Sequence, residues 1–379
     1  PMPPSGFQQI NIARWAVAAT FFVNGTLIGV WAANIPLVKE ALGLDAQFLS
    51  YALFSAAFGA LAGMPFGGKL IAKFGSARVT LVSGLGALVT FPAAMLAPSY
   101  PVLLAVLVAA GFANGVMDVA MNAHGALVEQ RISRPVMSSF HAAWSTGGLI
   151  GSGFVWLALN TLGTKLLVFG MAVVLLAAFL LAISRYLSST LDQVADAAHF
   201  ALPSRQTLAL GSIAFLGMLS EGAVLDWSGV YLRELLASPS LAASGVAGFS
   251  GTMALSRFFG DGLRAKFGAA SLVRGSAVIS LAGLVVALLA HGPLLAALGF
   301  ALMGVGVGNI APVIYGAAGR LKGVESGVAI ASVLTMGYAA FLLGPPLIGF
   351  VAQLTTLQFG LGLVGIACAL IAVSSSADT

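Results

Sequence analysis

Charged side chains are scarce in this sequence of 379 residues, because Asp, Glu, Lys and Arg together make up only 8% of it. A soluble domain carries about 25% of such residues. The single cysteine, Cys368, excludes an internal disulfide and a cysteine-based metal cluster. Short segments of alternating polar and apolar residues, typical of outer-membrane barrels, are also missing. Hydrophobic residues make up 59% of the chain instead, which predicts an all-α integral membrane protein.

Apolar runs of about 20 residues recur along the whole chain, and each is long enough to cross a hydrocarbon core of roughly 30 Å as a helix. The longest polar loop, 187–206, predicts a cytoplasmic linker between an N-terminal six-helix bundle, 1–186, and a C-terminal six-helix bundle, 207–379. The runs predict twelve transmembrane helices, at 14–37, 47–68, 77–97, 101–128, 137–160, 164–186, 207–235, 241–263, 269–290, 293–318, 327–351 and 355–374.

The positive charges indicate how the chain crosses the membrane. Of the 17 lysines and arginines, all but Lys39, Lys165 and Arg233 fall on the side that holds both termini, if Arg257 is counted with the loop after its span. Since cytoplasmic loops are enriched in Lys and Arg, both termini are expected in the cytoplasm. The same bias accounts for the net charge of +5 without nucleic-acid binding.

Two segments of the chain repeat each other. FGGKLIAKFG at 66–75 and FGDGLRAKFG at 259–268 share seven of ten residues, and each follows the second span of its half. A weaker match sets Asn24-Gly25 against Glu221-Gly222. Such internal repeats are typical of secondary transporters, whose substrate site lies near the bilayer midplane between the halves. The sequence therefore predicts two pseudo-symmetric bundles.

Twelve spans, a central linker and a G-x-x-x-x-(K/R)-x-G-x-x-(K/R) loop resemble the major facilitator superfamily over essentially the whole chain. The stretches NGVMDVAMNAHG (114–125) and EGAVLDWSGVYL (221–232) further resemble a bacterial branch near the fucose-permease-like members. The resemblance implies the major facilitator fold, alternating access, a place in the inner membrane of a bacterium, and a gating role for the loop residues. These are Gly68, Lys73, Gly75 and Arg78, with a degenerate copy at Asp261, Lys266 and Gly268.

The chain departs from the family pattern in three places. Ala72 stands where an acidic residue usually precedes the basic loop position, which puts the gating contact of relatives in doubt. The fourth span lacks the arginine that many proton-coupled members carry. The fifth span is rich in glycine but lacks the Gly-Pro pair of drug/proton antiporters, which argues against drug efflux.

Carboxylates inside the spans are the first functional candidates. An acidic side chain at the bilayer centre costs roughly 2.5–3.5 kcal/mol on insertion scales, so it persists only where protein or water shelters it. Asn114, Asp118 and Asn122 recur at i, i+4 and i+8, which places them along one face of the fourth helix near mid-membrane. The stripe either joins neighbouring helices or faces a solute. Asp118 and Glu221 are the proton-coupling candidates, because a sheltered carboxyl can load and release a proton.

Polar groups beside aromatic rings are candidates for solute binding, since ring faces stack and edges form hydrogen bonds. Aromatic side chains at such places can equally anchor the protein at the membrane interface, and His141 can equally be a helix-packing residue. Asp226 either pairs with Arg233 or faces an outer vestibule. The solute-binding candidates are Asn24, Trp31, Asn34, Asn114, Asn122, His141, Trp144, Asp226, Trp227, Asn309 and Tyr315.

These features predict a secondary active transporter that moves a small polar organic solute, for example a sugar-like one, in symport with protons. Export of metabolites or drugs and a non-transporting solute sensor remain alternatives, since direction is not encoded in these motifs. No metal-ligand set, nucleophile–base motif or nucleotide-binding motif is present, so neither a cofactor nor enzymatic activity is expected. The expected partners are the solute, protons and the lipid bilayer, with no nucleic acid, and a monomer is expected.

Overall fold

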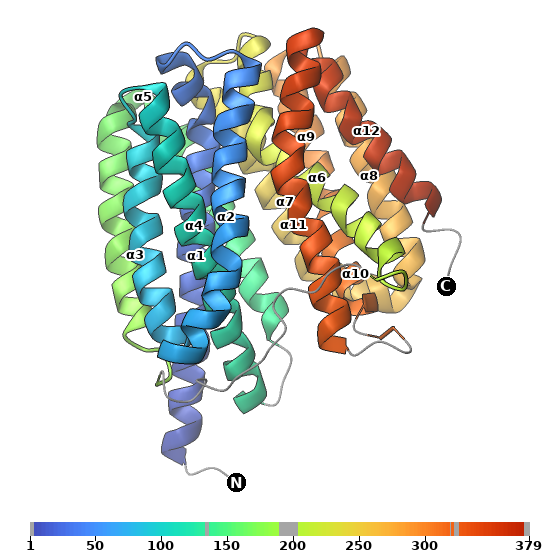
Figure 1. Cartoon of the computed structure of the whole chain (residues 1–379). Coiled ribbons are helices and arrows are strands. Elements are labelled where there is room, and N and C mark those ends of the chain that lie inside the picture. Colours follow the sequence, from blue (N-terminus) through green and yellow to red (C-terminus); the bar gives the residue numbers. More distant parts are fainter. Residues whose placement is uncertain (1–3, 133–135, 189–203, 319, 322–325, 375–379) are drawn as a thin grey trace.

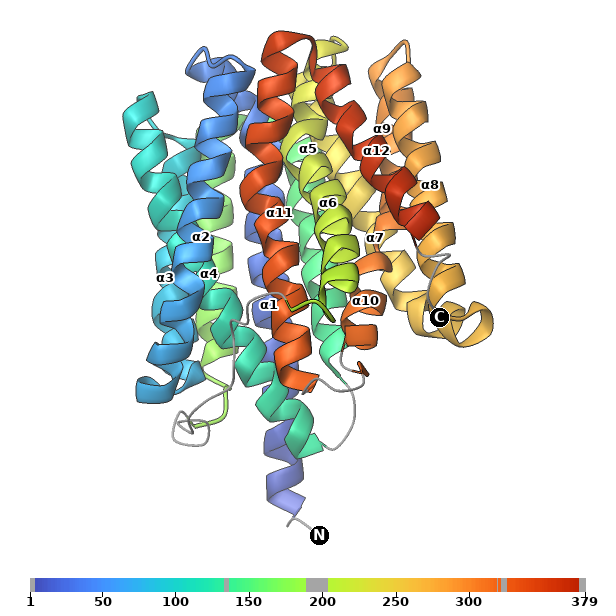
Figure 2. The same cartoon turned by 45° about the vertical axis from the view of Figure 1, so that its right-hand side comes forward.

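The computed structural model describes residues 4–132, 136–188, 204–318, 320–321 and 326–374, and every regular element in these ranges is a helix. The helices stand side by side in two groups, α1 to α5 and α6 to α12 (Figures 1 and 2). Their bounds are α1 Pro4–Ala41, α2 Ala46–Phe74, α3 Ser76–Met95, α4 Tyr100–Ile132, α5 Met137–Ile183, α6 Leu208–Glu234, α7 Pro239–Phe267, α8 Ala269–Leu289, α9 Pro293–Val307, α10 Ile310–Ala318, α11 Ser326–Leu354 and α12 Leu357–Ser374.

Twelve crossings result, as predicted, although they do not map one to one onto these helices. Gly163 has φ 69° and ψ 163°, which breaks α5 into two arms that match the predicted fifth and sixth spans. The predicted span 293–318 is one crossing interrupted between α9 and α10, at Gly308 and Asn309. Among the described residues, ten stretches are apolar and long enough to span; one covers both arms of α5. The α7 helix, which is rich in Gly, Ser and Thr, is not among these ten.

The sequence repeat folds into the same local structure twice. Gly75 ends α2 and Gly268 ends α7, with φ of 78° and 79°. Glycine adopts such a positive φ without the steric cost that a Cβ atom imposes, so the chain turns sharply into the next helix at both places. The preceding lysines also match: Lys73 Nζ lies 5.1 Å from the ring centroid of Phe74, and Lys266 Nζ lies 5.2 Å from that of Phe267. The seven shared residues therefore encode a helix end and its corner.

Small residues bring the helices of each bundle close together. A Cβ atom on Gly111 of α4 would fall on the backbone carbonyl of Ala56 of α2, and one on Gly147 of α5 would fall on that of Phe22 of α1. The α1 helix accordingly packs on α5 and α2 on α4, and the pairs α6 with α11 and α7 with α9 repeat this arrangement in the second bundle. Close backbone approach through small residues is a common way for helices to associate in a membrane.

The bundles meet along two seams, α5 on α7 and α2 on α11. We call the end at which α1 begins the inner end of the molecule and the end at which α1 stops the outer end. Near the outer end, Arg233 of α6 pairs with Glu40 of α1, with 3.1 Å between Nη2 and Oε2. Asn160 of α5 donates to the hydroxyl of Ser240 of α7 at 3.0 Å. Polar contacts therefore join the two bundles at the outer end.

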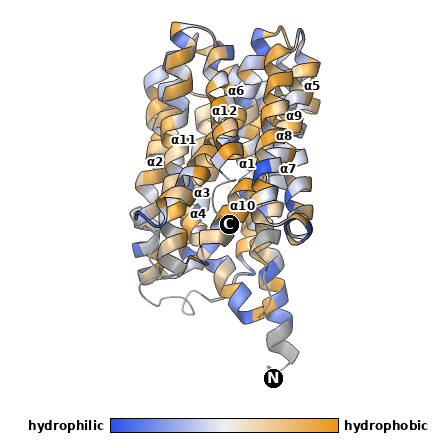
Figure 3. Cartoon of the chain, turned by 90° about the vertical axis from the view of Figure 1, so that its right-hand side faces the viewer, coloured by the Kyte–Doolittle hydropathy of each residue, from blue (hydrophilic) through white to orange (hydrophobic). Residues whose placement is uncertain are grey.

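The outside of the molecule is apolar over most of the helix length. Leu157, Val82 and Phe258 are more than two-thirds exposed and stand on three different helices. Hydrophobic residues dominate the ribbon between the two ends, whereas hydrophilic residues gather at the ends and connections (Figure 3). This distribution fits a protein surrounded by lipid chains.

Candidate functional site

Asp118 lies in the middle of α4, about 20 Å from the inner end of that helix at 1.5 Å per residue. Its Oδ2 accepts a hydrogen bond of 2.7 Å from the hydroxyl of Tyr338 on α11, and its Oδ1 accepts one of 3.1 Å from the amide of Asn122. Within the part of the chain that the structure describes, no cation pairs with this carboxylate. Asp118 thus lies between the two bundles with neutral donors as its partners.

Glu221 lies at a similar depth, about 20 Å from the beginning of α6. Its Oε2 is 3.1 Å from Nη2 of Arg257 on α7, and the two side chains are only 8% and 12% exposed. Arg257 also donates from Nη1 to Oγ of Ser145 on α5, at 2.8 Å, and from Nε to the carbonyl of Gly308, at 3.1 Å. One guanidinium therefore neutralises a buried carboxylate, contacts the opposite bundle and satisfies a carbonyl at the break between α9 and α10.

Arg257 lies inside α7, as the predicted span 241–263 has it, ten residues or about 15 Å before the helix ends at Phe267. Its count among the charges of the cytoplasmic side is therefore wrong. The sequence already contained this information. The repeat motif marks the end of the helix at Gly268, and Arg257 lies several turns before that point. Tyr338 was also missed, since an isolated tyrosine in an apolar span gives no sign of its partner 220 residues away.

Two further side chains join the two carboxylates into one group. Tyr315 of α10 lies within electrostatic range of Asp118, Glu221 and Arg257, and Tyr338 lies within range of Tyr315 and Glu221. The central cluster, as we name it, consists of Asp118, Glu221, Arg257, Tyr315 and Tyr338. Four helices of the C-terminal bundle and one of the N-terminal bundle supply it.

A neutral polar trio of the N-terminal bundle comprises Asn24, Asn114 and Trp144. The amide nitrogen of Asn24 donates to Oδ1 of Asn114 at 2.7 Å, and the indole of Trp144 donates to Oδ1 of Asn24 at 2.9 Å. The structure thus brings together three of the predicted solute-binding residues from α1, α4 and α5. Asn114 and Trp144 keep part of their surface exposed, as side chains that line a solute path must.

His141 lies near both groups of residues. It is exposed, its ring meets that of Phe21 edge-on at 5.3 Å, and it is within electrostatic range of Arg257. Because its surface remains accessible beside the central cluster, His141 stays a candidate for solute contact.

Trp31 and Asn34 lie in packed surroundings. The ring of Trp31 packs on Phe91 with 6.0 Å between centroids, and its side chain is only 7% exposed. The fully buried Asn34 donates to the carbonyl of Val30 at 2.7 Å. The structure does not bring these residues to the central cluster or the polar trio among the contacts of the described chain.

The remaining candidates have separate surroundings. Trp227 is fully buried, and Asn309 fastens the α9–α10 break to α7 by donating to Oγ of Ser256 at 2.7 Å. Tyr315, expected beside Asn309, instead donates to Sδ of Met218 at 2.9 Å. Asp226 does not pair with Arg233, because the arginine is held by Glu40.

The loop-motif residues lie at the inner end of the molecule. Lys73, Arg78 and Lys266 are exposed, whereas Gly75 and Gly268 form the two corners described above. Gly68 belongs to the last two turns of α2. The backbone of Asp261 lies in α7, but its side chain is outside the described part of the structure. The gating role of this motif stays a prediction.

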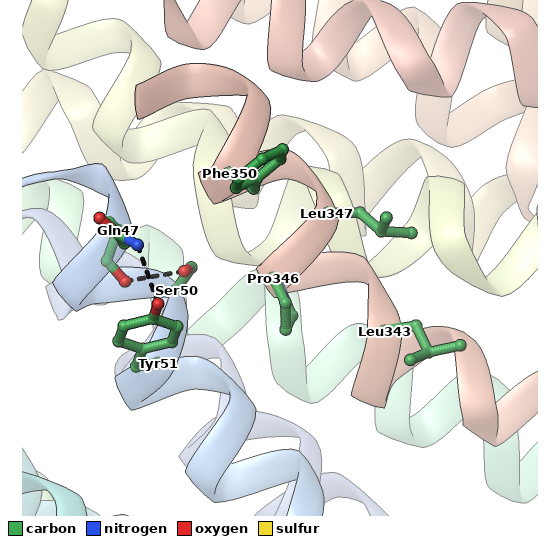
Figure 4. A pocket seen from close by; sticks show the side chains of 7 residues that line it. All are labelled: Gln47, Ser50, Tyr51, Leu343, Pro346, Leu347 and Phe350. Atoms are coloured by element: carbon green, nitrogen blue, oxygen red, sulfur yellow. Dashed lines mark hydrogen bonds between the residues drawn. The ribbon is translucent and has the colours of Figure 1, made fainter. Parts of the chain in front are cut away.

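A pocket of about 330 Å³ opens on the flank of the molecule, between α2 and α11 (Figure 4). Gln47, Ser50 and Tyr51 line one side, while Pro346 and Phe350 stand on the other. It shares no residue with the central cluster or the polar trio, and most of its lining is apolar. We therefore assign the site to the interior polar residues and not to this flank.

Two bundles of membrane-spanning helices that enclose ionisable groups at mid-depth define a multi-pass membrane transporter. The Major Facilitator Superfamily profile matches residues 17–232, which is more than half of the chain, and the chain belongs to this family.

Bacterial relatives match over nearly the whole length. An uncharacterized MFS-type transporter of Yersinia pestis is 34% identical over 364 residues, covering 95% of this chain and 94% of its own. The uncharacterized transporter y4wD of Sinorhizobium fredii is 35% identical, with coverage of 94% and 96%. The membrane protein MosC of Rhizobium meliloti is 32% identical, with coverage of 89% and 83%.

Solved structures confirm the major facilitator fold. The nucleoside transporter NupG superposes with a TM-score of 0.70 at 16% identity, covering 96% of this chain and 98% of that chain. The fucose:proton symporter FucP of E. coli superposes with a TM-score of 0.64 at 15% identity, covering 98% and 100%. The expected likeness to fucose-permease-like members is thereby confirmed at the level of the fold.

Proposed function

We propose that this protein is a secondary active transporter that moves a small polar organic solute by alternating access, in symport with protons, and that Asp118 carries the proton. The bond between Asp118 and Tyr338 is the observation that carries this proposal, because it connects an ionisable group at mid-membrane to the opposite bundle. Protonation removes the negative charge of the carboxylate and adds an O–H donor to a group that until then only accepts, so it alters the bond that holds α4 to α11.

Glu221, the other proton-coupling candidate, is better suited to remain ionised than to exchange a proton. It forms an ion pair with Arg257 in nearly buried surroundings, and removing its charge by protonation would leave the guanidinium unpaired. Asp118 has no such cation to lose among the described residues. This difference favours Asp118 as the proton carrier.

Solute contacts are assigned to the polar trio and His141, with hydroxyl or amide groups of the solute replacing hydrogen bonds of Asn24 and Asn114. One structural neighbour is a nucleoside transporter and another is a fucose:proton symporter, so small polar organic solutes are carried on this fold. We assign the chain to the inner membrane, with both termini in the cytoplasm. It is proposed to act as a monomer of two bundles, 1–186 and 207–379. The loop motif is proposed to form part of the gate at the inner end.

Proteoliposomes that enclose a pH-sensitive dye test the proposal. Solutes that raise the unfolding temperature of the purified protein are added outside, since ligands of the folded state stabilise it. Wild type should acidify the lumen together with solute entry, whereas Asp118→Asn should exchange solute without moving protons. Asp45→Asn is the matched control, because asparagine caps a helix as well as aspartate does at this outer loop.

Other outcomes would redirect the assignment. Equal proton movement in wild type and Asp118→Asn removes Asp118 from the mechanism. Binding without any flux favours the sensor, and proton movement opposite to the solute favours export.

A further inference from the structure

Asp226 occupies a distinct position on α6, between the central cluster and the outer end. It lies eight residues before the helix ends at Glu234, about 12 Å below the outer end. Gly222 and Gly229 are four residues before it and three after it, so all three share one helix face. That face meets α11 and α1: a Cβ atom on Gly222 would lie 2.8 Å from the ring of Phe341, and one on Gly229 would lie 2.9 Å from Pro36. Asp226 therefore faces the junction between the two bundles.

The carboxylate of Asp226 has no partner within the described residues. No hydrogen bond and no ion pair engages it, although its side chain is partly buried in the interior of the molecule. The arginine of the same helix and the arginine of the next helix, α7, already have carboxylate partners. Arg233 pairs with Glu40, and Arg257 pairs with Glu221. A carboxylate in this position is costly to keep ionised unless a group outside the described chain compensates its charge, and without such a group it takes up a proton.

The interior carries a surplus of negative charge. Asp118, Glu221 and Asp226 supply three carboxylates, whereas Arg257 supplies the one guanidinium that the described interior places among them. Asp118 accepts bonds from two neutral donors, and Glu221 is neutralised by the arginine. Only Asp226 retains all of its acceptor capacity. The unmet requirement at this position is thus for a cation with N–H or O–H donors.

We propose that Asp226 anchors a protonated amine of the transported solute. This inference rests on the proposed function and narrows the solute to small polar amines. An ammonium group supplies both the opposite charge and up to three hydrogen-bond donors, which is what the free carboxylate lacks. A transition-metal ion fits poorly, because the described residues contain no group of three or more His, Cys, Asp or Glu side chains that could hold one.

The location of Asp226 also explains how such a group is retained. The contact of Gly229 with Pro36 and the ion pair of Arg233 with Glu40 lie one and two turns above it, toward the outer end. The polar trio belongs to the facing bundle, deeper in the molecule than Asp226.

Matched solute sets provide the test on the purified full-length protein. Glucosamine, glucose and glucuronate share a ring and differ in charge, as do ethanolamine, ethylene glycol and glycolate in a smaller set. Amines should raise the unfolding temperature of wild type more than their neutral and anionic counterparts at equal ionic strength. Asp226→Asn should weaken amine binding by about tenfold or more, whereas Asp226→Glu should retain the preference for amines. Glu234→Gln, an acid-to-amide change on the same helix, is the control and should bind as wild type does.

Several results would overturn the inference. A neutral or anionic member that stabilises wild type at least as well excludes amine recognition, and so does the absence of any amine-specific shift. Persistence of the preference in Asp226→Asn would exclude this residue, and a shift from sodium chloride alone would assign the position to an inorganic cation. Proton-coupled flux of a neutral solute would leave the proposed function intact while the inference fails.

Discussion

The hydroxyl of Tyr338 lies 2.7 Å from Oδ2 of Asp118, and this bond joins α11 to α4 across the two bundles. No cation pairs with Asp118 among the described side chains. Any movement that separates α4 from α11 must break the bond, so it connects the chemistry of one carboxyl group to the relative position of the bundles.

Tyr338→Phe should keep the ring and remove the donor. The expected loss is about 1.5–3 kcal/mol of unfolding free energy, the range for hydrogen bonds to charged groups. Thermal unfolding in detergent measures it. Tyr51→Phe is the control, because the Tyr51 hydroxyl bonds to Gln47 on the exposed flank. Equal losses of unfolding free energy in the two variants would mean that the hydrogen bond to Asp118 stabilises the protein no more than the exposed hydrogen bond of Tyr51 does.

Replacing either member of the Glu221–Arg257 pair should be costly. Removing one partner of a buried ion pair leaves the other charge uncompensated, at about 3–5 kcal/mol. The double variant Glu221→Gln with Arg257→Gln should therefore lose less stability than the sum of the single changes. A double-mutant cycle by thermal unfolding measures this coupling. Additivity within about 0.5 kcal/mol would contradict a direct pair.

Gly111→Ala should destabilise the N-terminal bundle. The new Cβ atom would meet the Ala56 carbonyl on α2, and such overpacking costs about 1–3 kcal/mol. Gly153→Ala on α5 is the matched control, because no atom lies within 4 Å of a Cβ atom built there. Unfolding temperatures of the two variants compare the effects. A similar small change in both would show that α2 and α4 pack less tightly than described.

Glu40→Gln should loosen the outer end without unfolding the protein. The Arg233–Glu40 side chains are 29% and 42% exposed, and an ion pair of this kind contributes at most about 1 kcal/mol to stability. Because the pair joins α1 to α6, hydrogen exchange should accelerate near both helix ends at 36–44 and 230–236. Lys39→Gln is the control. Since salt screens exposed charges, high ionic strength should reproduce part of the effect in wild type. No acceleration of exchange in either condition would show that the pair does not hold α1 to α6.

The candidate site was only partly predictable. The sequence identifies Asp118 and Glu221 as candidates, because an acidic residue in an apolar span is costly whichever way the helix is rotated about its axis. Asn24, Asn114 and Trp144 were named as separate candidates, and the structure joins them into one trio. Periodicity places a side chain on a helix face, but it does not say which neighbouring helix that face meets.

The sequence by itself determined the crossings and the corners of this protein. Span length follows from hydropathy, and the corners at Gly75 and Gly268 follow from a backbone conformation that glycine alone adopts without strain, so both are local properties. Tertiary structure decided the partners: Tyr338 for Asp118, and Arg257 for Glu221 with a contact to Ser145. The physical reason is that the rotation and depth of each helix are set by its packing against helices distant in the chain, and no local pattern encodes that packing.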